Sequence, residues 1–312
     1  MLSRRLLTTD PGMRERFGDP FRPLEPECRV IQFDERLTPA QLEKAGRLIV
    51  DRPDVELYVY DRTWRDLSFL KYFKTLQRLH IALYDLDDIT GLSEVPWLRE
   101  LTFGETRKKF SLRFVAAWPR LKRLFLIKHK TDLHCIRGLT ELENLGLSGY
   151  TLPDLSLLLP LVKLRKLSLS LGGTRNLAAL AQLPELEDLR LMRITKLSDL
   201  GILADLVGLK ALELIWMRNV TSLPSLTGLE RLDEVTLDTM KGLTDLSPLA
   251  AAPALRRLVV GDMRQLTADS FRCFIGHPRL QELWADTGRR KLNAQVKQML
   301  PFVIRAFPNQ AP

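Results

Sequence analysis

Leucine residues recur along this chain in a fixed frame. The stretch from Leu232 to Leu255 reads L-x-x-V-x-L, then five further residues, then L-x-x-L-x-x-L, and it ends on the residue that opens the next copy. From Asp54 onward the sequence holds ten complete copies of 21 to 25 residues and an eleventh, truncated copy. Self-similarity on this scale predicts a solenoid of stacked coils, in which each copy packs on its neighbours.

The fourth and sixth positions of the frame are apolar and alternate with outward positions, as in a β-strand with one buried face. The sixth position holds Val59, Ile81, Phe103, Leu126, Leu147, Leu169, Leu191, Leu214, Leu237, Val260 and Ala285. Each strand is expected to pair with its equivalent in the next coil, giving a parallel concave sheet about 50 Å long. A second apolar set, such as Leu243, Leu246 and Leu249, is expected to return along the convex side through short helical turns.

Motifs such as LTDLSPL (243–249) and KLSDLGIL (196–203) resemble the short leucine-rich repeats of bacterial internalin-like proteins. The resemblance covers residues 54–285 and implies an α/β solenoid, the leucine-rich repeat horseshoe. One column departs from it. Internalin-like repeats usually carry Asn three residues after the sixth position, but here the column reads Arg62, Tyr84, Thr106, His129, Tyr150, Gly172, Ile194, Met217, Met240 and Met263. We call the turn that follows each strand the corner. Without an Asn column, the backbone N–H and C=O groups at the corner must find other hydrogen-bond partners.

The segments outside the repeats suggest caps. Residues 1–27 are rich in Pro and Arg and are expected to form an irregular arm. Residues 28–53 predict a strand–helix cap, because Thr38 and Gln41 have the spacing of a capping box. Residues 54–288 hold the repeats. Residues 289–312 predict a C-terminal cap helix and tail, with Pro301 ending or kinking the helix.

Composition narrows the setting of the protein. The chain has 312 residues, of which 45% are hydrophobic, but its apolar runs are too short for a transmembrane helix. The N-terminus lacks the apolar stretch of about 7–15 residues that a signal peptide needs. The three cysteines are far apart and form no C-x-x-C pair. We therefore expect a cytoplasmic protein with structural thiols and no membrane partner.

The formal charge of +9 is concentrated in one segment. Residues 107–130 carry nine basic residues and no acidic one. Two interpretations stand side by side: a solvated edge of the solenoid, or a docking patch for an acidic partner or nucleic acid. Charges of both signs at the third position of the frame favour a protein partner over nucleic acid.

Clusters that could carry chemistry are few. His129, Asp132, His134 and Cys135 have the residue types of a zinc site but not a familiar ligand spacing. Cys273 lies four residues before His277, and helix packing explains that pair better than catalysis does. We predict a non-enzymatic protein that needs no metal or cofactor.

The outward positions of the strands and the residue that follows them are more informative. Aromatic, Met and Arg residues gather there, and these types concentrate binding energy in interfaces. Small residues such as Gly146 and Ser168 lie between the groups and would let a partner approach closely. The candidate partner-binding residues are Tyr58, Tyr60, Arg123, Phe125, Ile127, Lys128, Arg190, Met192, Arg193, Ile215, Trp216 and Trp284.

The favoured function is that of a protein-binding scaffold that holds its partner on the concave face. A narrower hypothesis is an immunity or inhibitor protein that blocks a toxin or effector. The alternatives are a regulatory adaptor and a nucleic-acid-binding protein that uses the basic segment 107–130.

Overall fold

The computed structural model describes residues 3–7, 19–33, 35–60 and 63–300. The predicted tail at 301–312 and much of the predicted arm lie outside these ranges. The chain divides into two compact units, Met1–Leu145 (unit 1) and Gly146–Pro312 (unit 2).

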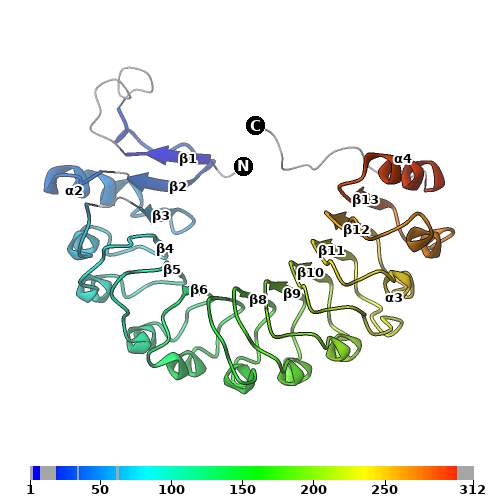
Figure 1. Ribbon diagram of the computed structural model, residues 1–312. Helices are drawn as coiled ribbons and strands as arrows, with labels where there is room; N and C mark the ends of the chain where they lie inside the picture. Colours follow the sequence, from blue (N-terminus) through cyan, green and yellow to red (C-terminus); the bar gives the residue numbers. More distant parts are fainter. Residues whose placement is uncertain (1–2, 8–18, 34, 61–62, 301–312) are drawn as a thin grey trace. The chain divides into compact units, whose positions relative to one another are not determined.

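Each repeat contributes one short strand, and within each unit the strands are parallel and follow one another in chain order (Figure 1). The sequence frame sets the register, because equivalent positions face each other: Leu189 pairs with Leu212, and Leu57 with Leu79. Strand β7 runs across the boundary between the units. The strands are β1 Ser3–Leu6, β2 Cys28–Phe33, β3 Glu56–Val59, β4 Arg78–Ile81, β5 Glu100–Phe103, β6 Arg123–Ile127, β7 Asn144–Ser148, β8 Lys166–Ser170, β9 Asp188–Met192, β10 Ala211–Ile215, β11 Glu234–Asp238, β12 Arg257–Gly261 and β13 Glu282–Asp286.

Short helical turns occupy the side of the coils opposite the strands in each unit (Figure 1). Most begin at a side chain that accepts the backbone N–H two residues later, as Asp199 does from Gly201 at 2.7 Å and Asp245 from Ser247 at 2.8 Å. The helices are α2 Pro39–Leu48, α3 Ser247–Ala250 and α4 Arg290–Met299; the 3₁₀ helices are η1 Ser68–Tyr72, η2 Thr90–Glu94, η3 Leu112–Ala117, η4 Leu133–Gly138, η5 Ser156–Leu158, η6 Ala178–Gln182, η7 Gly201–Asp205 and η8 Asp269–Phe274.

The leucine columns form the core. The fourth- and sixth-position side chains are buried, and so is the returning set Leu243, Leu246 and Leu249. The two apolar columns of the strands thus face the apolar residues of the helical turns inside each coil. The predicted leucine-rich repeat solenoid with a parallel sheet is confirmed.

The N-terminal segment differs from the prediction of an irregular arm. Residues Ser3–Leu6 form β1, which pairs in parallel with β2 and extends the sheet by one strand. Arg5 holds this strand in place, because its guanidinium donates to the Arg22 carbonyl at 2.6 Å and pairs with Glu25. The run SRRL carries no alternating apolar pattern, so only the tertiary contact shows that it is a strand.

Helices α2 and α4 form in the two segments where the sequence predicts cap helices. The capping box of α2 is confirmed: the Gln41 N–H donates to the Thr38 hydroxyl, and the Thr38 N–H donates to Gln41 Oε1 at 2.8 Å. Gly46 lets α2 pack closely on the next coil, since a Cβ there would lie 1.9 Å from the Tyr72 carbonyl oxygen. At the other end, α4 buries Leu292 and Val296.

The corner that lacks the Asn column is built by the backbone. The residue after each strand, position eight of the frame, adopts a left-handed conformation at Lys128, Leu171, Arg193, Trp216, Thr239 and Asp262. In unit 2 its N–H continues the ladder to the next coil, as in Trp216 N–H to the Asp238 carbonyl at 2.8 Å. A left-handed non-glycine residue costs roughly 1–2 kcal/mol, which the added hydrogen bond and buried position-nine side chain offset.

Candidate partner-binding surfaces

We call the outward side chains at positions five and seven of the strands the sheet face. In unit 1 an aromatic cluster of this face lies on β3, on the residue that follows β3, and on β4. Tyr58 lies 5.1 Å from Tyr60 and 4.3 Å from His80, measured between ring centroids. The Nδ1 atom of His80 is 3.8 Å from a Glu56 carboxylate oxygen. All three rings are half-exposed, as expected for the outward side of a sheet.

Strand β6 and its corner hold four of the predicted site residues. Phe125 and Ile127 are half-exposed, and the Arg123 guanidinium lies 6.0 Å from the centre of the Phe125 ring. The Lys128 ammonium is 2.9 Å from Glu105 on the preceding coil. The hydrogen bond from Lys128 lowers the pKa of the Glu105 carboxyl. Lys128 is therefore already paired.

The basic segment 107–130 is largely neutralised by its neighbours. Glu100 lies 3.7 Å from Arg123, and Asp132 lies 3.2 Å from Arg113. The basic residues of the segment that have a carboxylate partner are Arg107, Lys109, Arg113, Lys122, Arg123 and Lys128. A segment without acidic residues of its own thus gains carboxylates from adjacent coils. This pairing weakens the case for a nucleic-acid site there.

In unit 2 the sheet face becomes aliphatic in its middle. Met192 on β9 and Ile215 on β10 are register partners, and both are half-exposed. Beside them the Arg190 guanidinium lies 3.3 Å from the Glu213 carboxylate. Trp284 is half-exposed on β13, opposite Val259. The predicted residue Arg190 is thus one half of an ion pair that borders the apolar pair.

Arg193 and Trp216 belong to a different surface. Both occupy the left-handed corner, and the Arg193 guanidinium lies 4.8 Å from the centre of the indole. They line a hollow of about 700 Å³ at the ends of strands β9–β12, which we call the Trp216 hollow. Its charged and aromatic lining residues are Arg193, Trp216, Arg218, Asp238, Lys241 and Asp262.

Sequence reasoning missed Arg218 and Lys241. Both occupy position ten of the frame, two residues beyond the corner, where Arg264 follows in the next copy. This basic column was visible in the sequence. The sequence did not show that these residues line a hollow with Trp216, because only the turn of the backbone brings position ten beside position eight.

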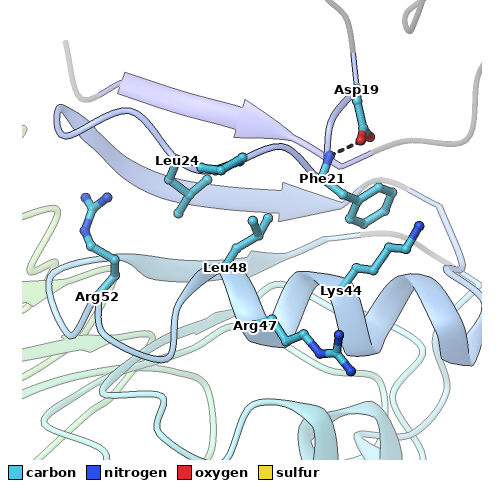
Figure 2. Close-up of a pocket in the computed structure, with 8 residues that line it drawn as sticks. Asp19, Phe21, Leu24, Lys44, Arg47, Leu48 and Arg52 are labelled. Carbon is cyan, nitrogen blue, oxygen red and sulfur yellow. Dashed lines mark hydrogen bonds between the residues drawn. The ribbon is translucent and has the colours of Figure 1, made fainter.

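A second hollow of about 470 Å³ lies between residues 19–24 and helix α2 (Figure 2). Phe21, Leu24 and Leu48 give it an apolar lining. Two of its cations are already occupied: Arg47 pairs with Glu43 at 2.6 Å, and Arg52 binds Asp54 at 2.9 Å and the Cys28 carbonyl at 2.6 Å. The hollow is therefore less available to an anionic ligand than the Trp216 hollow.

The candidate zinc residues are not arranged around a common point. His129 is buried, stacks on Phe103 at 4.4 Å, and binds backbone groups of Gly104 and Phe110. Within the part of the chain that the structure describes, no group of three or more His, Cys, Asp or Glu residues could hold a metal ion.

The thiol of Cys273 is half-buried, and burial raises its pKa to about 11. His277 Nε2 lies 3.1 Å from the Ala252 carbonyl oxygen and so is engaged with the backbone.

Of residues 3–7, 19–33, 35–60 and 63–300, none belongs to a helix long and apolar enough to cross a membrane.

Comparison with known proteins supports the fold. No family model and no curated protein matches the sequence. An internalin (InlF) from Listeria monocytogenes is similar in structure, with a TM-score of 0.55 and 19% identity over 86% of this chain and 76% of that one. Internalin C2 from the same organism gives a TM-score of 0.44 and 22% identity over 72% and 84%. The functional domain of InlJ gives 0.49 and 16% over 82% and 52%. The chain is a leucine-rich repeat protein with an internalin-like fold.

Proposed function

We propose that the protein binds a partner protein on the sheet face of unit 2 and catalyses no reaction itself. The observation that carries the proposal is the pair Met192 and Ile215, two apolar side chains that meet on adjacent strands and remain half-exposed. The helical turns of unit 2 lie on the other side of the coils (Figure 1). An apolar centre with a charged border is the usual composition of a protein interface.

The rigidity of the face supports the same proposal. Strands β9 and β10 are joined over five residue pairs, so their backbone loses little conformational entropy when a partner binds. The Arg190–Glu213 ion pair holds two side chains in position before a partner binds. Preorganisation of this kind lowers the free-energy cost of association.

The test is partner capture from the native host with the wild-type chain and two variants. Ile215→Lys places a charge in the centre of the sheet face and should abolish capture. Val207→Lys is the matched control, because Val207 is an exposed aliphatic residue outside the strands, 63% accessible. Equal capture by both variants would rule out this face as the binding surface.

A narrower form of the proposal is that the partner is a toxin or effector whose activity is blocked when it is bound. A large rigid surface supports it, because such a surface can cover an active site without rearranging. The activity of the captured partner should fall when the wild-type chain is added and should persist with Ile215→Lys. A partner that stays fully active in the complex would point to an adaptor instead.

We also propose a reducing compartment, in line with a cytoplasmic location. Its support is that Cys28, Cys135 and Cys273 are all free thiols. Cell fractionation with a tagged chain tests this proposal.

A further inference from the structure

We propose that the Trp216 hollow binds an acidic, extended segment of a protein. It would be a second contact beside the sheet face. The proposal rests on the proposed function only in assuming a protein partner.

The first support is uncompensated positive charge. Arg193, Arg218 and Lys241 are exposed, and within the described residues none has a carboxylate within ion-pair distance. Other cations near the strands of unit 2 are paired: Lys210 lies 2.7 Å from Glu187, and Arg257 lies 2.6 Å from Glu282. Three cations without a carboxylate partner that line one hollow can bind the anionic groups of a ligand.

The carboxylates of the hollow offset these cations only in part, because Asp238 and Asp262 face the three cations Arg193, Arg218 and Lys241. Asp262 lies 3.2 Å from Arg264, and Asp238 accepts a hydrogen bond from the Thr239 hydroxyl at 2.5 Å. Asp262 thus shares its charge with Arg264, and both carboxylates keep oxygen lone pairs that can accept further hydrogen bonds. Arg193 lies against the indole, and all three cations can still bind carboxylates of a ligand, because stacking leaves the N–H groups of a guanidinium available.

The indole provides an apolar contact within the basic setting. Trp216 is 43% exposed, although tryptophan is usually buried in a folded protein. The backbone N–H of Trp216 donates to the Asp238 carbonyl at 2.8 Å, and the backbone N–H of Arg193 donates to the Ile215 carbonyl at 2.9 Å. The backbone under both side chains is thus fixed. An aliphatic side chain of the ligand can pack on a ring that is already in position.

The mixed lining favours a polypeptide over a nucleic acid. Asp238 and Asp262 would face the phosphates of a nucleic-acid strand, whose backbone lacks N–H donors. A peptide offers both partners: its carboxylates meet the cations, and its amide N–H groups donate to the aspartates. A hollow of about 700 Å³ has room for a few residues of an extended chain.

The experiment measures binding of a short fluorescein-labelled peptide of alternating Glu and Leu to the full chain at about 50 mM salt. The same peptide with Gln in place of Glu is the ligand control. Arg218→Glu and Lys241→Glu should each weaken binding about tenfold. Arg175→Glu is the matched control, because Arg175 is exposed in the same unit but outside the hollow, and it should change binding less than about twofold.

Trp216→Ala should also weaken peptide binding, while its melting temperature stays near that of the wild type. The proposal is overturned if the peptide does not bind, if the Gln peptide binds equally well, or if folded Arg218→Glu and Lys241→Glu bind as the wild type does. Tighter binding of oligouridine, lost in the same two variants, would assign the hollow to nucleic acid.

Capture of the native partner separates the two proposals. If the wild-type chain captures the native partner but does not bind the peptide, the proposal for the hollow fails and the proposal for the sheet face is unaffected. Peptide binding by the hollow, with capture insensitive to Ile215→Lys, refutes the sheet face alone.

Discussion

Replacing His129 by phenylalanine should destabilise unit 1 and remove a pH dependence of its stability. The imidazole is buried at position nine of the frame, between two backbone groups. Its Nε2 lies 2.9 Å from the Gly104 carbonyl oxygen, and its Nδ1 accepts from the Phe110 N–H at 3.4 Å. These partners require the neutral tautomer with its proton on Nε2, because a carbonyl can only accept.

The magnitude follows from the two contacts. Phenylalanine keeps the ring that stacks on Phe103 but offers no hydrogen bond, so a buried donor and a buried acceptor lose their partner. Each such loss costs about 1–3 kcal/mol, and the long contact to Phe110 belongs at the lower end. We expect the free energy of unfolding to fall by roughly 2–4 kcal/mol. Lys130→Ala is the control, since Lys130 is exposed and such changes stay within about 0.5 kcal/mol.

The pH dependence has a definite sign. Burial lowers the pKa of His129, opposed in part by its hydrogen bond to Gly104. The unfolded chain therefore binds this proton at a higher pH than the folded chain. The contribution of neutral His129 is complete above about pH 6.5 and is lost as the pH falls, by at most about 1.4 kcal/mol per pH unit.

Urea unfolding followed by circular dichroism between about pH 5 and 7.5 measures this slope. The carboxyls with lowered pKa, such as Glu105 and Asp132, lose their contribution only below about pH 4.5, so they leave the window clear. His129→Phe should flatten the curve between about pH 5 and 6.5. If the free energy of unfolding of this variant depends on pH as that of the wild type does, then His129 is not the buried neutral group that we describe.

Two further variants test the core and the corner of unit 2. Leu191→Ala removes a fully buried side chain and should cost roughly 2–5 kcal/mol by denaturant unfolding, and a loss below about 1 kcal/mol would mean that the strand is out of register. Gly172→Ala places a Cβ 2.1 Å from the Tyr150 carbonyl oxygen and should cost roughly 1–3 kcal/mol by the same measurement. Its control Gly228→Ala meets its nearest atom at 4.0 Å and should be neutral or stabilising, so equal effects at Gly172 and Gly228 would contradict the close packing of the corner.

The repeat frame allowed the fold to be predicted because its period determines both burial and register. Leu57, Leu79 and Leu101 occupy the same position of successive copies, and the strands pair them directly. The corner could not be predicted in the same way. Lys128, Leu171 and Trp216 share a positive φ that their residue types disfavour. At Leu171 and Trp216 this conformation accompanies a hydrogen bond from the backbone N–H to the next coil.

The candidate sites were harder to predict for a related reason. Charge in this protein is balanced between coils, so the partner of a side chain lies about one repeat away, as Asp85 does from Arg107. A segment can therefore be strongly basic in sequence and mostly paired in space. The converse holds at Arg218 and Lys241, which are dispersed in sequence and gather unpaired in one hollow.

Photo-cross-linking from the sheet face tests the central claim most directly. A benzophenone amino acid at position 215 should form a covalent adduct with one discrete protein in cells of the native host. The same amino acid at position 207 should form none. Adducts of equal yield from both positions, or none from position 215 in a folded chain, would contradict the assignment of the sheet face of unit 2 as a partner-binding surface.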